Sequence, residues 1–251
     1  MIPFYRKIRK QLADEKKPLK YLRYAVGEML LVVIGILIAL QINNWNENRK
    51  DQNRTEKLFQ NLEANLRTDS VALAGIITII GNSLEKQEII ISTSSEALLD
   101  TYNKEELRKT VREIWAGFYS FDPKLGVYNQ LLSSNLMDLI ESDEIKEALR
   151  DYYDYRCPRY VTVDHVLDIK YHETFHKFLA EDLAVNYFGN MDDLSSSPEF
   201  SLAMIDKLKT ECRNVYDLTY AVYGILEELK KDIDKLLVLI DNELGPYDTD
   251  P

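Results

Sequence analysis

The chain has 251 residues, of which 45% are hydrophobic and 29% are charged. This length suffices for one packed domain of ordinary size, and the hydrophobic share excludes a wholly disordered chain. Residues 1–50 carry ten Lys or Arg and four Asp or Glu, a net charge of +6, whereas the other residues carry 21 and 38, a net charge of −17. We expect no binding to nucleic acid, because that binding depends on basic side chains that release phosphate counterions.

The first segment, residues 1–20, is predicted to be a basic amphipathic segment in the cytosol. Phe4, Ile8 and Leu12 recur at steps of four among basic residues, which favours a short helix lying on anionic lipid. A disordered basic tail is the alternative.

Residues 21–45 are predicted to be a transmembrane helix. Residues 29–40 are uninterrupted apolar or glycine residues, and residues 25–42 are broken only by Glu28 and Gln41. A helix of that length spans roughly 27 Å, close to the thickness of a thin hydrocarbon core. Tyr21, Tyr24 and Trp45 stand where aromatic rings prefer the membrane interface. These flanks favour a span over a buried core helix.

The span is expected to stay attached as a signal anchor. The residues after Ala39 offer no pair of small residues for cleavage, and no cysteine follows that would form a lipoprotein site. Eight basic residues precede the span and three follow it, which predicts a cytosolic N-terminus and an extracytoplasmic body. The eight are Arg6, Lys7, Arg9, Lys10, Lys16, Lys17, Lys20 and Arg23, and the three are Arg49, Lys50 and Arg54.

Three residues inside the span suggest contacts. Glu28 lies about one turn inside the cytosolic boundary, where a charge is costly and often functional, although it also has room to extend toward the headgroups. Gly35 and Ala39 form a pair of small residues four apart, which would let two spans approach closely.

The stretch YLRYAVGEMLLVVIGILIALQINNWNENRK, with the upstream YRKIRKQL, resembles the N-terminal signature of an uncharacterised bacterial family. Its members are small single-span membrane proteins that carry a domain of unknown function. The resemblance covers about residues 4–50, through Gly27-Glu28, Gly35 and residues 41–46. It implies a bacterial cytoplasmic-membrane protein of similar layout and supplies no activity.

The remainder, residues 46–251, is predicted to be a helical body. An apolar pattern at helical spacing runs from Phe59 to Ile91, with only Asp69 and Gln87 polar in that register. Asn103 and Glu106 form a capping-box pattern that opens a second helix, which Asp122-Pro123 would end. This second helix would carry Leu107, Val111, Ile114, Trp115 and Phe118 on one side.

Ser142 opens a third helical run, with Ile145, Leu149, Tyr152 and Tyr153 on its apolar side. Pro158 and the strand-like residues 161–163 predict a kink or break. The apolar pattern then resumes at Val166, Ile169, Phe175, Leu179 and Leu183, and residues 195–198 form a turn.

The last helix, opened by Glu199 and ended by Gly245-Pro246, has the cleanest repeat in the chain. Eleven positions alternate steps of three and four: Ile205, Leu208, Cys212, Val215, Thr219, Val222, Leu226, Leu229, Ile233, Leu236 and Ile240. Such a seam is coiled-coil-like and requires a partner helix. The fold class is therefore predicted to be all-α, an antiparallel helical bundle with long coiled-coil-like helices.

Two features carry reactive side chains. Cys157 and Cys212 would both lie outside the cytosol, where either a disulfide or two free thiols are compatible with the sequence. His172-Glu173-x-x-His176 matches the H-E-x-x-H pattern, in which two histidines on one helix face bind Zn²⁺ and the Glu acts on bound water. No third ligand is evident, because Leu179 replaces the glycine of the extended pattern.

We therefore predict a single-pass, non-enzymatic binding, sensor-like or scaffold protein, and assign no catalytic, metal or cofactor site. Its partners would be the lipid bilayer and a membrane protein or second copy of the chain. The alternatives are a membrane-anchored zinc hydrolase that uses His172, Glu173 and His176, and a metal-binding regulator that also uses His165. The sixteen tyrosines are predicted to pack at the rim of the core, with their hydroxyls in water, or else to line a ligand or partner surface.

Overall fold

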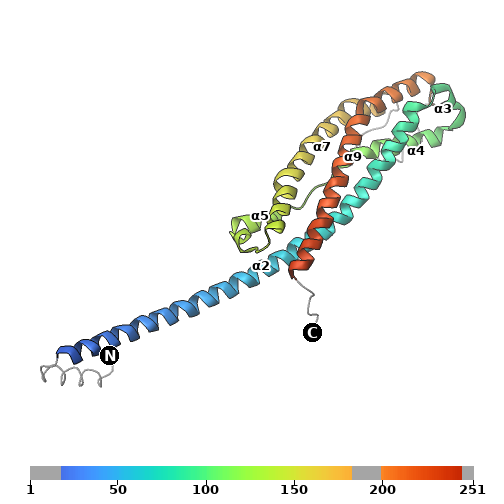
Figure 1. The fold of residues 1–251 in the computed structure, drawn as a ribbon. Coiled ribbons are helices and arrows are strands. Elements are labelled where there is room, and N and C mark those ends of the chain that lie inside the picture. Colours follow the sequence, from blue (N-terminus) through green and yellow to red (C-terminus); the bar gives the residue numbers. More distant parts are fainter. Residues whose placement is uncertain (1–17, 183–198, 245–251) are drawn as a thin grey trace. The chain divides into compact units, whose positions relative to one another are not determined.

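A computed structural model describes residues 18–182 and 199–244 (Figure 1). The predictions for residues 1–17, Leu183, the turn at 195–198 and Gly245-Pro246 lie outside the described residues. The chain divides into two compact units, Met1–Thr55 and Glu56–Pro251. The first described helix, α2, is continuous from Pro18 to Ser92 and belongs to both units.

In the first unit, the apolar stretch of α2 buries none of its side chains. Every residue from 29 to 42 is exposed, and Ala25 and Glu28 are half-buried. Trp45 is exposed as well. The described part of the chain therefore has one helix that is long and apolar enough to cross a membrane, near the N-terminus.

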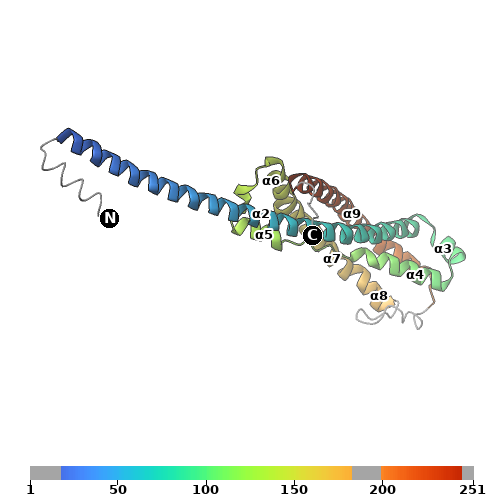
Figure 2. The same cartoon turned by 90° about the horizontal axis from the view of Figure 1, so that it is seen from below.

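In the second unit, α2 pairs with the last helix, α9 (Leu202–Leu244), and the two run in opposite directions. Arg67 of α2 binds Asp241 near the end of α9, whereas Lys209 near the start of α9 donates to the Thr93 carbonyl just after α2. Figures 1 and 2 both show α9 beside the later part of α2. This confirms the antiparallel arrangement predicted from the sequence.

Short helices connect these two. After α3 (Ser95–Thr101), α4 (Lys104–Trp115) opens with the predicted capping box, in which the Asn103 side chain accepts from backbone N–H groups and Glu106 reaches back to the Asn103 N–H. A 3-10 turn, η1 (Ala116–Phe118), follows. The helix therefore ends at Trp115, well before the predicted stop at Asp122-Pro123. α5 (Gly126–Ser133) and the 3-10 turn η2 (Leu136–Leu139) complete the connection.

The third run is one long helix with two π-helical turns. It contains α6 (Asp143–Arg150), the π-helix η3 (Asp151–Arg156), α7 (Cys157–Tyr171), the π-helix η4 (His172–His176) and α8 (Lys177–Asp182). Ser142 caps it as predicted, since its side chain accepts from the Ile145 N–H. The predicted break at Pro158 is wrong, because the run stays helical through this residue, which lies just after the π-helical turn η3 and in the first turn of α7.

The inward face of α7 also differs from the prediction. Val166 and Ile169 are exposed, while Leu167 and Tyr171 are buried one and two positions later. The inward face instead contains Tyr160, Leu167 and Tyr171, which follow one another at steps of seven and four. Phe175 and Leu179 are buried as predicted.

All eleven predicted seam positions of α9 are buried. The corresponding face of α2 buries Phe59, Leu62, Leu66, Leu73, Ile80 and Leu84, together with the polar Asp69 and Gln87. Since the described residues contain helices and turns and no strand, the predicted all-α fold is confirmed.

Candidate functional site

The histidine motif occupies the π-helical turn η4 between α7 and α8. The rings of His172 and His176 lie 6.0 Å apart in a T-shaped arrangement. His172 Nδ1 is 2.9 Å from the Asp168 carbonyl oxygen, and the His176 ring lies 6.2 Å from the Trp115 ring. Burial, and secondarily the nearby His172, lowers the pKa of His176. Both rings are therefore packed against neighbouring groups of the helix and the core.

Among residues 18–182 and 199–244, the other acidic and histidine side chains of this helical run do not complete a metal site with these two rings. His165 and Glu173 are exposed on the same helical run. Asp182 is paired with Lys207, and Glu181 lies 4.0 Å from Lys177. Within residues 18–182 and 199–244, no group of three or more His, Cys, Asp or Glu side chains is placed to hold a metal ion.

A buried neutral polar centre lies one residue before the motif, around the Tyr171 hydroxyl. Gln87 Nε2 of α2 donates to this hydroxyl at 3.1 Å and also contacts Ser83 Oγ at 3.1 Å. Ser83 donates to the Ile114 carbonyl at 2.8 Å, which binds α2 to α4. On the opposite side, Thr219 Oγ1 of α9 lies 3.4 Å from Tyr171 Oη. Four helices thus meet at one hydrogen-bonded group.

Gly117 packs directly against the hydrogen-bonded groups of this neutral centre. A Cβ at Gly117 would lie 2.6 Å from Tyr171 Oη, closer still to Ser83 Oγ, and 3.0 Å from Ser83 Cβ. No side chain fits there without moving the hydrogen-bonded groups. The Tyr171 pKa is raised to about 12 by burial, so the hydroxyl is a neutral donor at physiological pH.

A second, charged centre lies around Asp69, which is 1% exposed. Asp69 Oδ2 accepts from the Lys124 backbone N–H at 3.0 Å, and Oδ1 lies 3.5 Å from Lys124 Nζ. Burial raises the pKa of Asp69, while the contacts with Lys124 act in the opposite direction. Asp69 therefore fixes the segment between η1 and α5 against α2.

Tyrosines surround the charged centre. The rings of Tyr128 and Tyr153 stack 4.5 Å apart, and Tyr152 meets Tyr153 edge-on at 4.7 Å. Tyr160 Oη accepts from the Phe121 N–H at 2.7 Å and bonds Asp164 at 3.0 Å, which provides a second attachment for the segment before α5. Tyr152, Tyr153 and Tyr160 are buried, which agrees with the apolar side predicted for Tyr152 and Tyr153 but not with the expectation that the hydroxyls lie in water.

The two cysteines are free and buried. Burial raises the pKa of Cys157 to about 12 and also raises the pKa of Cys212. Because only a thiolate is an effective nucleophile, neither sulfur is activated for chemistry at neutral pH. Of the two alternatives that the sequence left open, the structure has the free thiols.

One surface pocket, of about 190 Å³, lies between α6 and α9. It is lined by Glu144, Glu147, Ala148, Asp151, Asp232 and Lys235. This volume is below the few hundred Å³ usual for small-molecule sites. The Arg156 guanidinium lies 3.6 Å from Asp232 and pairs with Asp151, so part of the negative charge is already compensated.

Sequence patterns pointed only partly to these centres. Asp69, Gln87 and Thr219 are polar residues on otherwise apolar seams, and that interruption was the available signal. Tyr171 and Gly117 had no such signal, because their roles depend on contacts between distant segments.

The fold and these centres define an all-α protein with a helical body and one candidate membrane span. The chain matches a protein family of unknown function (DUF6090) over residues 28–188, more than half of its length, and belongs to that family. Comparisons with curated proteins and with solved structures give no match.

Proposed function

We propose that the protein is a single-pass protein of the bacterial cytoplasmic membrane whose helical body acts outside the cytosol as a non-enzymatic binding or scaffold protein. The observation that carries the proposal is the exposure of the apolar face of α2. Twelve large apolar side chains between residues 26 and 42 are each roughly half exposed or more. Burying one such side chain fully is worth about 1.5–3 kcal/mol, so leaving twelve of them about half exposed to water costs on the order of 10 kcal/mol.

That cost is comparable to the whole stability of a typical domain, so the segment requires an apolar environment. Insertion as a signal anchor supplies one. The excess of basic residues before the span supports a cytosolic N-terminus, and the net charge of −17 after residue 50 is compatible with an extracytoplasmic body.

The chemistry of the body supports binding rather than catalysis. Its thiols are buried and protonated, and its buried polar groups are mostly bonded to one another across helices. Such groups align the helices and leave few reactive atoms for a substrate. A binding role needs only a stable surface, which the bundle provides.

The zinc hydrolase has one observation in its favour, the adjacent rings of His172 and His176. It would still need a third ligand and an accessible metal position. Purification of the full chain without a tag, followed by metal analysis by mass spectrometry, tests it. About one zinc per chain that is lost in His176→Ala, with hydrolysis lost in Glu173→Gln, would replace the proposal with the hydrolase.

The membrane proposal is tested by fractionation of cells that express the full chain with a C-terminal reporter. We expect the protein to resist carbonate extraction and the reporter to be active only outside the cytosol. The double variant Ile34→Arg, Ile38→Arg should enter the soluble fraction, because each arginine at the membrane centre costs about 2.5–3.5 kcal/mol on insertion scales. Asn46→Arg, outside the apolar stretch, is the matched control. Extraction of the wild-type chain by carbonate would contradict the proposal.

A further inference from the structure

The part of α2 in the second unit has an exposed face without charges. We call it the uncharged face, and define it by Ala64, Thr68, Val71, Gly75, Ile79 and Asn82. All six are exposed, and they follow one another at steps of three or four, which places them on one side of the helix. The chain has no charged residue between positions 70 and 84, although 29% of all its residues are charged. The face covers about five turns, or roughly 28 Å.

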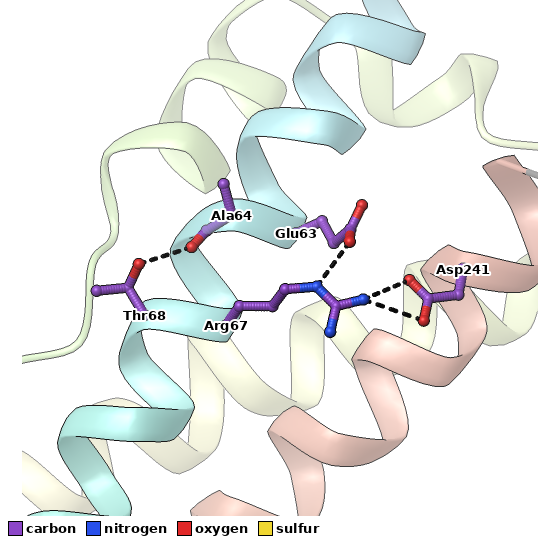
Figure 3. A network of polar contacts seen from close by, with 5 residues as sticks. All are labelled: Glu63, Ala64, Arg67, Thr68 and Asp241. Carbon is purple, nitrogen blue, oxygen red and sulfur yellow. Dashed lines mark hydrogen bonds and ion pairs between the residues drawn. The ribbon is translucent and has the colours of Figure 1, made fainter. Parts of the chain in front are cut away.

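The uncharged face points away from the partner helices of the bundle. Figure 3 shows Arg67 reaching toward Asp241 of α9, whereas Thr68 lies on the side of α2 away from Asp241. The Thr68 hydroxyl donates to the Ala64 carbonyl at 2.8 Å, so this polar group is satisfied within the helix. Apart from the Asn82 amide, the face therefore presents apolar side chains, a satisfied hydroxyl and backbone, and it carries no charge.

Val71 and Gly75 leave room for a second helix on the uncharged face. Val71 is 75% exposed, more than Leu31, which with 66% is the most exposed large apolar residue of residues 25–42. One turn later, a Cβ added at Gly75 would meet no atom within 4 Å. An exposed valine next to a glycine allows close approach of a second backbone, as in pairs of helices that contact through small residues.

We propose that the uncharged face of α2 is the interface with a second, parallel copy of this chain. Charge favours this occupant. Two bodies of net charge −17 repel each other, and a parallel pair places each residue opposite its own copy, so only an uncharged face allows contact without like charges opposed. The outward side of α9, by contrast, carries charged residues such as Asp217, Glu228 and Lys231.

The size of the face fits an interface that forms between anchored chains. One helix pair over five turns buries less than the roughly 1,000 Å² that free partners need. Two copies held in one membrane share their orientation and have a high effective concentration, which compensates for a small interface. In this respect the inference rests on the proposed membrane anchor.

Cysteine crosslinking of the full chain in native membranes tests the interface. We would compare Val71→Cys and Gly75→Cys with Ala74→Cys, an exposed position on the same helix that points about 100° away from Gly75. A disulfide forms only when the two Cα atoms lie within about 7 Å. We expect oxidation to yield a disulfide-linked species of twice the chain mass for the first two variants, and about tenfold less for Ala74→Cys. The wild-type chain measures the background from Cys157 and Cys212, which are buried.

A second variant keeps the proposal falsifiable. In the double variant Val71→Glu, Gly75→Glu, like charges would oppose each other across the interface, so crosslinking of two chains through their amines should be lost. The circular dichroism spectrum should remain helical, because both positions face solvent. Equal disulfide yields at positions 74 and 75, only monomer at all positions, or a product whose mass requires a different protein would each overturn the second-copy interface.

Carbonate extraction of the same membranes separates this proposal from the membrane anchor. A chain that resists extraction but stays monomeric overturns the interface and leaves the anchor intact. A chain that is extracted but still crosslinks at Gly75→Cys supports the interface and contradicts the anchor.

Discussion

The neutral centre around Tyr171 and the charged centre around Asp69 both hold other segments against α2 through buried polar groups, but with different chemistry. Each sits where α2 interrupts its apolar seam, each has a buried tyrosine, and each lies near one buried thiol. In the neutral centre the hydrogen-bonded groups are all uncharged and come from four helices. In the charged centre a buried carboxylate binds one connecting segment. The comparison teaches that neutral groups can hold helices together at low cost, whereas a buried charge holds a segment at the expense of stability.

The largest expected effect is on the neutral centre, from Gly117→Ala. The added methyl group would overlap Ser83 Oγ and Tyr171 Oη, so the hydrogen bonds must break or the backbone must shift. We expect a loss of about 1–3 kcal/mol in unfolding free energy, measured by denaturant titration of the full chain in detergent. Gly75→Ala is the matched control, since its methyl group enters open space and removes a helical glycine at a gain of up to about 1 kcal/mol. Equal effects at both glycines would mean that the centre tolerates the added methyl group.

Tyr171→Phe should have the next largest effect. It keeps the ring in the core but removes the hydroxyl that accepts from Gln87 and contacts Thr219. Leaving a buried amide donor without that partner costs about 1–3 kcal/mol. The same titration measures it. If the double variant Tyr171→Phe, Thr219→Val recovers none of the loss, the two hydroxyls are not coupled.

Asp69→Asn should change the unfolding free energy less, and should increase it at pH 7. Asparagine can still accept from the Lys124 N–H, and it removes the buried charge. Because the pKa of Asp69 is raised in the folded state, its contribution to stability is fully present below the ordinary aspartate pKa near 4 and is lost as the pH rises through the raised value. The variant should therefore match the wild type in acid and exceed it by about 1 kcal/mol at pH 7. Asp69→Ala, which leaves the N–H unpaired, should instead destabilise, and a less stable Asp69→Asn at pH 7 would contradict this account.

The last and smallest expected effect is the reactivity of the two buried thiols, one near each centre. Cys157 and Cys212 should both resist a soluble thiol reagent in the native protein and both react in denaturant, with two thiols titrated per chain. Rapid reaction of either one in the native state would show that its centre opens to solvent. Titration of no thiols in denaturant would indicate a disulfide in the cell.

Sequence patterns predicted the parts of the fold that depend on local spacing. The eleven seam residues of α9 and the caps at Asn103 and Ser142 follow from helical periodicity and from side chains that satisfy nearby N–H groups. The π-helical turns were not predictable, because a shift of one hydrogen bond leaves no compositional mark. For Tyr152, Tyr153 and Tyr160 the exposure of the hydroxyl was mispredicted, for a different reason. A tyrosine suits the rim or the core, and the Phe121 N–H that satisfies Tyr160 comes from a distant segment.

For the candidate site, the polar interruptions at Asp69, Gln87 and Thr219 were visible, but their pairing was not. Which of them meet depends on how far each helix is displaced along its neighbour. The histidine motif was the strongest chemical pattern in the sequence, yet the structure brings no third ligand to it among the described residues.

The two π-helical turns make the third helical run sensitive to insertions and deletions. A π-turn is equivalent to one extra residue inserted in an α-helix, and removal of one residue rotates everything that follows by about 100°. Loss of a single exposed residue such as Tyr155 from η3 would leave the run helical while turning Tyr171 away from Gln87. In this segment the number of residues matters as much as their kinds. Deletion of a single codon would keep the helix but would disrupt the packing of the bundle.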